Sequence, residues 1–284
     1  MRMTHLRLSL LVLFCSGLLG SAHAQEGRLA AITGLKSIKV AHRTDATPFS
    51  FISAFNDPIG YSVDLCKLVV EAMQRRLKLD ALKIEWVPVT TLNRMEMVAA
   101  GKADLECGAS TMTLSRMEQV DFSSTIFVES TGLLVKKDAG IASAKDLTGK
   151  KIAVIGGTTN ETAVRKVFAD TQTTIVPVGT RDEGVILLER GGVDALASDK
   201  LLLVGAEFAN PRALALLQDD LSIEPYALII PRGDFSMRVA VNGALAEVFR
   251  SGEVIKIYDK WFGQKGLRRG PLLNAVYLLG AIPE

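Results

Sequence analysis

The sequence AGKADLECGA at residues 100–109 has the same layout as RGGVDALASD at residues 190–199. In each copy a helical pattern ends at a glycine, an aspartate follows, and a short apolar run typical of a strand comes next. The letters match weakly, and helix-to-strand turns of many proteins share this layout. The copies lie about 90 residues apart, roughly the length of one small domain. We therefore expect two similar α/β lobes.

Short apolar runs alternate with helical patterns along most of the chain. In residues 62–78, Leu65, Val69, Met73 and Leu77 recur every four residues, as on a helix packed against a sheet. Strands that alternate with helices predict mostly parallel sheets. The expected strands are 38–42, 83–87, 104–107, 152–155, 174–178, 194–197 and 227–230, and the other expected helices are 91–100, 160–169, 182–190, 236–249 and 252–261.

Ligand-binding residues are expected where the two copies end, because ligands of open α/β sheets bind beyond the carboxyl ends of the strands. Ala109 and Asp199 occupy equivalent strand ends and would point into one cleft if the lobes face each other. Arg43, Arg94 and Arg116 each stand just past an expected strand or at a helix start. Any one arginine is commonly a solvated surface residue. Three at the same end of one lobe predict a site for a small acid, since a guanidinium pairs with a carboxylate through two hydrogen bonds.

A second binding element follows the expected strand at 152–155. The run IGGTTN at 155–160 opens a helix, and the free backbone N–H groups there, with the hydroxyls of Thr158 and Thr159, make an anion site. A capped turn without a ligand has the same pattern. Asp199 suits an ammonium group, and it also suits the N-cap of a helix at 200–207.

Composition and motifs argue against several functions. A net charge of +2 gives no nucleic-acid footprint. The Gly-x-Ser-x-Gly, His-Glu-x-x-His, Gly-x-x-x-x-Gly-Lys and Gly-x-Gly-x-x-Gly motifs are absent from the sequence. After residue 24 a single histidine, His42, is left for Ser/His or Cys/His catalysis, and one histidine with two cysteines does not favour a zinc site. We therefore expect no metal, no cofactor and no catalysis.

The first 24 residues have the pattern of a secretory signal peptide. Arg2 and Arg7 precede an apolar run at 8–19, and Ser21-Ala22-His23-Ala24 ends the segment. Twelve apolar residues are too few for a membrane anchor, which needs about 20. We predict cleavage after Ala24 and a mature, periplasmic chain from Gln25.

The predicted mature chain has 31 basic and 31 acidic residues, because the two arginines removed reduce the basic count from 33. It contains two cysteines, Cys66 and Cys107. In an oxidising compartment they indicate one disulfide, and two separately buried thiols fit the sequence nearly as well. The apolar tail at 271–283 is too short to span a membrane and is expected to pack as a strap on the body.

A series of motifs runs in order through residues 36–265: AHR (41–43), PFSF (48–51), GYSVDLC (60–66), VTTLNR (89–94), DLECG (104–108), DFS (121–123), GTT (157–159) and YDKWF (258–262). The series resembles the polar amino-acid solute-binding proteins of ABC importers, the bacterial extracellular solute-binding family 3. The resemblance is strongest to its glutamate/aspartate-binding branch.

The resemblance implies a type II periplasmic binding protein: two Rossmann-like α/β lobes joined by two hinge segments. Lobe 1 would comprise residues 25–132 plus 226–284 and lobe 2 residues 133–225, with the crossings near 130–133 and 224–226. Such a protein is a monomer without enzymatic activity. It captures glutamate or aspartate in the periplasm by hinge closure and delivers it to an ABC permease in the inner membrane.

The resemblance also implies how the amino-acid backbone of the ligand would be held. Arg116, with the backbone around Thr111 and Thr158, would bind the α-carboxylate. Asp199 and the carbonyl of Ala109 would bind the α-ammonium group.

The ligand's side-chain carboxylate would, by the same resemblance, contact Arg43, Arg94 and Thr91. Two positions depart from the pattern of the acidic branch. Ala109 stands where a serine is usual and loses a hydroxyl, and Arg181 stands where a histidine would help to hold the ligand. Arg181 would either strengthen the preference for an anion or admit a different acid.

Charge favours an acidic ligand. Arg43, Arg94, Arg116 and Asp199 sum to +2, so bound glutamate would leave +1 and glutamine +2. Buried unpaired charge costs roughly several kcal/mol, which disfavours the neutral ligand. Two alternatives are a periplasmic enzyme of the cyclic-acid dehydratase type on the same scaffold, and a binding protein for a different amino acid or small carboxylic acid.

Overall fold

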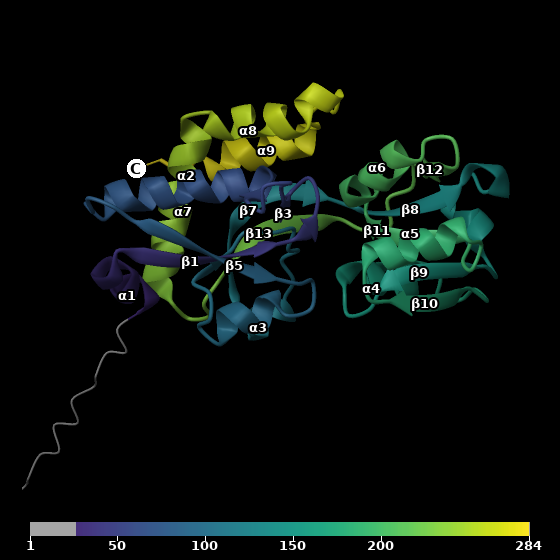
Figure 1. Cartoon of the computed structure of the whole chain (residues 1–284), viewed down its shortest axis with the longest axis horizontal. Helices are drawn as coiled ribbons and strands as arrows, with labels where there is room; N and C mark the ends of the chain where they lie inside the picture. The colour runs from purple at the N-terminus through teal and green to yellow at the C-terminus, as the bar shows by residue number, and fades with distance from the viewer. Residues whose placement is uncertain (1–26, 284) are drawn as a thin grey trace, which may run out of the picture.

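The structure, a computed structural model, describes residues 27–283, so the predicted signal peptide at 1–24 lies outside the described residues. The described chain forms two lobes that lie side by side, each built on one five-stranded sheet (Figure 1). The first sheet has the order β5-β1-β6-β13-β7 (Lys83–Val89, Ser37–Arg43, Leu105–Glu106, Glu224–Ile230 and Asp121–Glu129). The second has the order β10-β9-β11-β8-β12 (Thr174–Val178, Lys151–Ile155, Ala195–Asp199, Thr131–Lys136 and Leu214–Leu216).

Each sheet has a parallel part and an antiparallel part. β1 is parallel to β5 and β6, and β9 is parallel to β10 and β11, as strands alternating with helices predict. β13 runs antiparallel to β6 and β7, and β8 runs antiparallel to β11 and β12. The parallel strands of each lobe therefore end at one edge of their sheet, where the arginines and Asp199 are found.

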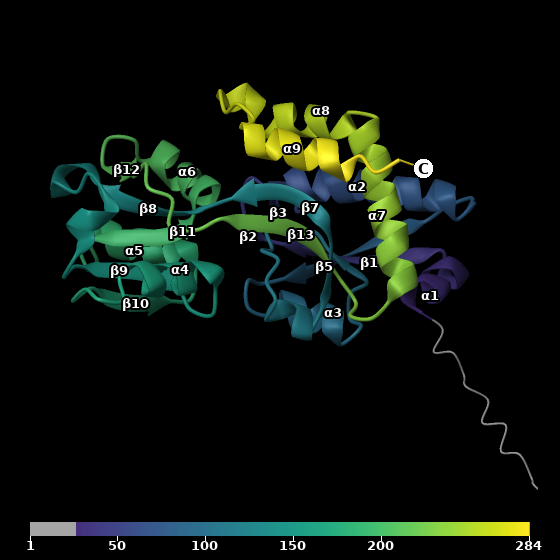
Figure 2. The same cartoon turned by 180° about the vertical axis from the view of Figure 1, so that it is seen from behind.

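The chain crosses between the lobes twice (Figure 2). It leaves the first sheet after Glu129 and enters the second at Thr131, then leaves at Leu216 and returns at Glu224. The division into 25–132 plus 226–284 and 133–225 stays a prediction, and the ends of these strands lie close to its boundaries.

Helices of the first lobe cover both faces of its sheet. The buried side chains of α2 include Leu65, Val69 and Met73, so three of the four positions in the predicted stripe face the core. Burial of one such side chain stabilises the fold by about 1.5–3 kcal/mol. The helices are α1 (Arg28–Leu35), α2 (Tyr61–Arg76), α3 (Arg94–Ala99), α7 (Phe235–Arg250), α8 (Glu253–Trp261) and α9 (Pro271–Gly280), with 3-10 turns η1 (Arg116–Glu118) and η4 (Gly263–Lys265) and a small sheet β2-β3-β4 (Asp45–Ala46, Ser50–Ile52 and Pro58–Ile59).

The second lobe is smaller and has a core on each face of its sheet. Val154 and Ala197 belong to one core, and Ala153 and Leu196 to the other, because successive side chains of a strand point to opposite faces. Its helices are α4 (Thr159–Val167), α5 (Arg181–Glu189) and α6 (Lys200–Ala209), with 3-10 turns η2 (Lys137–Ala139) and η3 (Ala144–Leu147).

A disulfide and the C-terminal helix both hold parts of the first lobe together. Cys66 in α2 and Cys107, just after β6, form a disulfide, which decides between the two interpretations of the cysteines. The C-terminal segment is a helix, α9, and its Tyr277 hydroxyl lies 2.8 Å from that of Tyr61 in α2. Within residues 27–283 no helix is long and apolar enough to cross a membrane.

Candidate functional site

Side chains from both lobes converge on one pocket between them. All ten residues that the sequence and the resemblance nominate line this pocket, although they come from widely separated segments. Four further residues complete its lining: three of them lie in the quoted runs 155–160 and 190–199 without having been singled out, and Leu202 lies outside those runs. The ten are Arg43, Thr91, Arg94, Ala109, Thr111, Arg116, Thr158, Thr159, Arg181 and Asp199, and the four are Ile155, Asn160, Ser198 and Leu202.

Arg94 is the first residue of α3 and is buried against β6. Its Nε donates to the Ser110 hydroxyl at 2.7 Å, and its Nη1 donates to the carbonyl of Thr91. Burial lowers the pKa of Arg94 to about 10, and the neighbouring charge of Arg43 adds to the lowering. Arg94 therefore stays protonated at neutral pH while neutral oxygen atoms fix its orientation.

Glu106 is a buried carboxylate behind this arginine. It is the last residue of β6, its side chain is fully buried, and neither of its carboxylate oxygens has a hydrogen-bond partner of ordinary geometry. Burial raises the pKa of Glu106, and the charge of Arg94 is the largest effect that opposes the rise. A Cβ at Gly108 would lie 2.1 Å from Glu106 Oε1, so only glycine fits beside this carboxylate.

The other two arginines of the first lobe are held differently. Arg43, at the end of β1, donates from Nε to Asp45 Oδ1 at 2.8 Å, and its Nη2 lies 2.7 Å from the same oxygen. Arg116, which begins η1, donates from Nη1 to the carbonyl of Thr111 at 2.7 Å. Burial is the main cause that lowers the pKa of Arg116, and the charge of Glu224 opposes it.

The second lobe contributes a helix start and a carboxylate. Thr158 is the N-cap of α4: its hydroxyl accepts from the Glu161 N–H at 3.2 Å and donates to the Ile155 carbonyl at 2.7 Å. Asn160 donates to Asp199 Oδ1 at 2.9 Å. Burial raises the pKa of Asp199, and this hydrogen bond opposes the rise. Asp199 stands at the N-cap position of α6 but makes no capping hydrogen bond there, which leaves its carboxylate to the pocket.

Two contacts join the lobes at the pocket. Arg181, at the start of α5, donates from Nη1 to the carbonyl of Asp45 at 2.7 Å. The hydroxyls of Thr111 and Thr159 lie 3.4 Å apart. Burial lowers the pKa of Arg181, and the charge of Arg43 across the cleft lowers it further.

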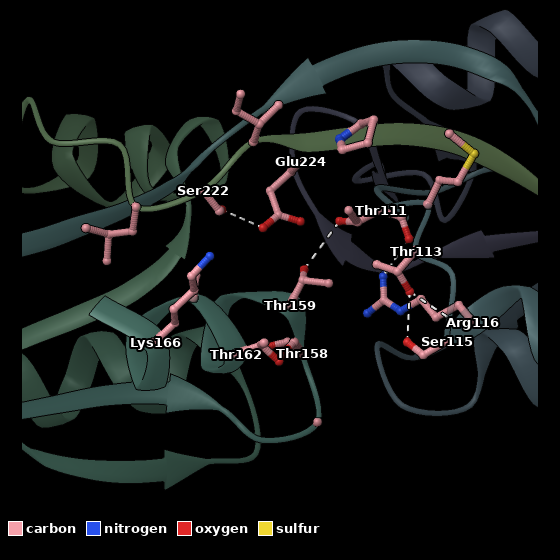
Figure 3. A pocket seen from close by; sticks show the side chains of 16 residues that line it. Thr111, Thr113, Ser115, Arg116, Thr158, Thr159, Thr162, Lys166, Ser222 and Glu224 are labelled. Carbon is pink, nitrogen blue, oxygen red and sulfur yellow. Dashed lines mark hydrogen bonds between the residues drawn. The ribbon is translucent and has the colours of Figure 1, made fainter. Parts of the chain in front are cut away.

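The pocket itself is tight in this structure. Its side chains enclose about 20 Å³ of free volume, room for about one water molecule. A cavity of about 530 Å³ adjoins it and shares Thr111, Arg116, Thr158 and Thr159 (Figure 3). Figure 3 shows the Glu224 side chain reaching from the β13 crossing toward the two threonines Thr111 and Thr159. A ligand as large as an amino acid therefore enters the tight pocket only when side chains move or the lobes part.

The net charge of the residues that line the pocket differs from the +2 expected from the sequence. Four arginines and Asp199 line it, so the lining carries +3 rather than +2, because Arg181 joins the set. Three carboxylates lie behind or beside the arginines: Asp45, Glu106 and Glu224. With all three ionised, they balance the lining charge. A preference for an acid must then come from direct hydrogen bonds more than from net charge.

No group of three His, Cys, Asp or Glu residues suited to a metal ion occurs in the part of the chain that the structure describes. The pocket offers guanidinium groups, backbone N–H groups and hydroxyls on one side, and a carboxylate with the Ala109 backbone on the other. Such a set matches a zwitterion that carries a further negative charge.

The two lobes, their strand order and a polar pocket between them define a type II periplasmic binding protein. The chain belongs to the bacterial extracellular solute-binding proteins, family 3, whose pattern matches residues 38–264. It is 37% identical over 253 residues to the L-glutamate/L-aspartate-binding protein of Pseudomonas aeruginosa, across 87% of this chain and 84% of that protein.

A second relative and a solved structure agree with this family. The glutamate/aspartate import solute-binding protein of Salmonella typhimurium is 33% identical over 272 residues, across 92% of this chain and 89% of that protein. An ancestral arginine-binding protein bound to arginine has a similar structure, with a TM-score of 0.71 and 30% identity, over 80% of this chain and 98% of that one.

Proposed function

We propose that this chain is the periplasmic substrate-binding component of an amino-acid ABC importer and that it captures glutamate or aspartate by hinge closure. The observation that carries the proposal is the convergence of four arginines and Asp199 on one pocket between the lobes. The protein works as a monomer, secreted by a cleaved signal peptide, and delivers its ligand to an inner-membrane permease without converting it. The names of the relatives from Pseudomonas and Salmonella support the acidic ligand.

The α-carboxylate of the ligand would bind Arg116 and the backbone at Thr111 and Thr158. Arg116 suits this role because one of its nitrogens is held by the Thr111 carbonyl, which orients the guanidinium and leaves its charge uncompensated by that bond. The N-terminus of α4 adds N–H groups aimed at an anion. Asp199 and the Ala109 carbonyl would accept hydrogen bonds from the α-ammonium group.

The side-chain carboxylate would bind Arg94, Arg43 and Thr91, with Arg181 closing over it from the second lobe. Glutamine is isosteric with glutamate, but its amide group offers one acceptor oxygen where the carboxylate offers two. Buried arginine N–H groups would then be left unpaired, at a cost of about 1–3 kcal/mol for each group. The ancestral protein of similar structure binds arginine, so the pocket contacts rather than the fold must select the acid.

Thermal unfolding of the ligand-stripped mature protein against an amino-acid panel tests the proposal. A ligand at 100 times its Kd adds about 2.7 kcal/mol of stability, a shift of roughly 5–10 °C for a chain of this size. We expect a shift with glutamate or aspartate and little or none with glutamine or arginine. A shift with arginine or glutamine alone would overturn the acidic ligand while leaving a transport role.

Two arginine variants distinguish loss of a pocket contact from a general effect of removing one positive charge on glutamate binding. Arg94→Met removes a charged donor inside the pocket, and loss of such a contact should weaken glutamate binding at least about 30-fold. Arg232→Met removes the same charge from an exposed turn of the first lobe and should leave binding unchanged. Equal binding by the Arg94 variant and the wild type would contradict the assignment.

A further inference from the structure

Asp45 contacts one arginine from each lobe. Its Oδ1 receives Arg43 Nε at 2.8 Å and lies 2.7 Å from Arg43 Nη2, and its backbone carbonyl accepts from Arg181 Nη1 at 2.7 Å. Asp45 is the first residue of β2, and no motif in the sequence pointed to it. The contact with Arg181 spans the cleft, at the end of the pocket assigned to the ligand's side chain.

The contact with Arg43 uses the edge of the guanidinium that carboxylates prefer. Nε and Nη2 form the side-on edge, which binds a carboxylate through two nearly parallel hydrogen bonds. Asp45 contacts that edge through one oxygen only: Oδ1 accepts from Nε, while Nη2 lies beside the same oxygen without a hydrogen bond of its own. A ligand carboxylate therefore gains the whole edge only after Asp45 has left, and otherwise meets Nη2 and the remaining N–H groups. Arg94 and Arg116 differ, because their contacts on the described chain are to the neutral oxygens of Ser110, Thr91 and Thr111.

The exposed fractions of the two side chains show that Asp45 is the partner free to move. The Arg43 side chain is 3% exposed, whereas the Asp45 side chain is 42% exposed. The Asp45 carboxylate can therefore turn into solvent, where water replaces the hydrogen bond that it loses, and the buried guanidinium of Arg43 cannot. The Asp45 carbonyl is fixed by comparison, because β2 pairs with β3 at Asp45 and Phe51.

We propose that Asp45 is a specificity-determining residue whose carboxylate competes with the ligand's side-chain carboxylate for Arg43. The proposal rests on the proposed function, because it assumes that Arg43 receives an acidic side chain. Binding then exchanges one carboxylate for another at Arg43, and the fixed carbonyl of Asp45 continues to hold Arg181 across the cleft. This exchange lowers the affinity for acidic amino acids and leaves that for uncharged ones unaffected.

Calorimetric titration of wild type, Asp45→Asn and Asp57→Asn with glutamate and glutamine tests the proposal. Asp57 is an exposed aspartate between β3 and β4, so its replacement makes the same change of charge away from the arginines. Asp45→Asn should bind glutamate about threefold to tenfold more tightly than wild type, with glutamine affinity within about twofold. Asp57→Asn should match wild type. Unchanged or weaker glutamate binding by Asp45→Asn overturns the proposal and makes Asp45 a support for Arg43.

Acetate separates failure of this proposal from failure of the proposed function. If wild type binds neither glutamate nor aspartate, the proposed function fails, and acetate still offers Arg43 a free carboxylate. Thermal unfolding in sodium acetate and in sodium chloride of equal concentration should then give a larger acetate-specific gain in Tm for Asp45→Asn than for wild type and Asp57→Asn. Equal gains in all three proteins would overturn the competition.

Discussion

Each arginine of the pocket is oriented by hydrogen bonds, and the nature of the acceptor decides how much charge is left for a ligand. Arg94 and Arg116 are held by hydroxyl and carbonyl oxygens, which fix the guanidinium planes without neutralising them. Arg43 is held by a carboxylate, Asp45, and is partly neutralised before any ligand arrives. Arg181 resembles the first two, because it is held by neutral oxygens, those of a serine hydroxyl and the Asp45 backbone. The pocket thus contains three arginines that are not hydrogen-bonded to a carboxylate and one, Arg43, that is.

Glu129 gives a test at the level of a single residue. It ends β7 in the first lobe and accepts from the Leu201 N–H of α6 in the second at 2.9 Å. Burial raises the pKa of Glu129 from 4.5 to about 8, the charge of Asp199 adds to the rise, and the Leu201 hydrogen bond and Lys200 oppose it. The folded state then holds a proton that the unfolded state loses between these two pH values, so the stability contributed by this group falls as pH rises through that window.

Glu129→Gln should remove this pH dependence, because glutamine still accepts from Leu201 but cannot ionise. Denaturant unfolding at pH 5 and pH 8 should give a variant that is more stable than wild type at pH 8, by on the order of 2 kcal/mol, with a smaller difference at pH 5. A variant destabilised equally at both values would show that Glu129 is ionised in the folded protein.

Most of the nominated residues could be found from the sequence because they follow a strand or open a helix, positions that a pattern of alternating elements reveals. Three came from the family resemblance alone: Thr91, Thr111 and Arg181. Glu106 and Asp45 could not be found in the same way. Glu106 lies inside the quoted run 100–109, and its one signal is a charged residue within an apolar strand. Asp45 depends on a turn of the backbone after β1 that brings its carboxylate back to Arg43, two residues earlier.

At the level of elements, sequence patterns predicted all the parallel strands and missed most of the antiparallel ones. The strands that overlap their expected ranges are β1, β5, β6, β9, β10, β11 and the antiparallel β13, whereas β7, β8 and β12 were absent from the expected set. β7 has no regular alternation of buried and exposed residues, and β8 is buried along almost its whole length, so neither gives the period-2 signal. The tail was expected as a strap and packs as the helix α9.

The Cys66–Cys107 disulfide links α2 to the strand that leads into the pocket and closes a loop of 41 residues. Restricting a loop of that length in the unfolded chain stabilises the fold by up to about 4 kcal/mol in the chain-entropy model. The double variant Cys66→Ala/Cys107→Ala should therefore lose about 2–4 kcal/mol in denaturant unfolding. Loss of less than about 0.5 kcal/mol would contradict a structural role for the bond.

At the scale of the whole molecule, two lobes meet through few direct contacts near the pocket and are joined by two crossings. The contacts from Arg181 to Asp45 and between Thr111 and Thr159 draw the lobes together beside the site. A ligand that bridges Arg94 in one lobe and Asp199 in the other adds contacts made only when the lobes are close, and so shifts the population toward the closed form.

Small-angle scattering of the ligand-stripped protein should give a radius of gyration that falls when glutamate is added, because the closed form is more compact. An unchanged radius at saturating glutamate would contradict closure.

On the proposed function, the buried arginines of the pocket select an acidic amino acid over a neutral one of the same shape. Isothermal titration calorimetry of the stripped mature protein with glutamate and with glutamine tests this selection most directly, because the two ligands have the same size and differ by one charge. We expect glutamate to bind at least about 30-fold more tightly than glutamine, a difference of about 2 kcal/mol. Equal binding of the two ligands, or tighter binding of glutamine, would contradict it.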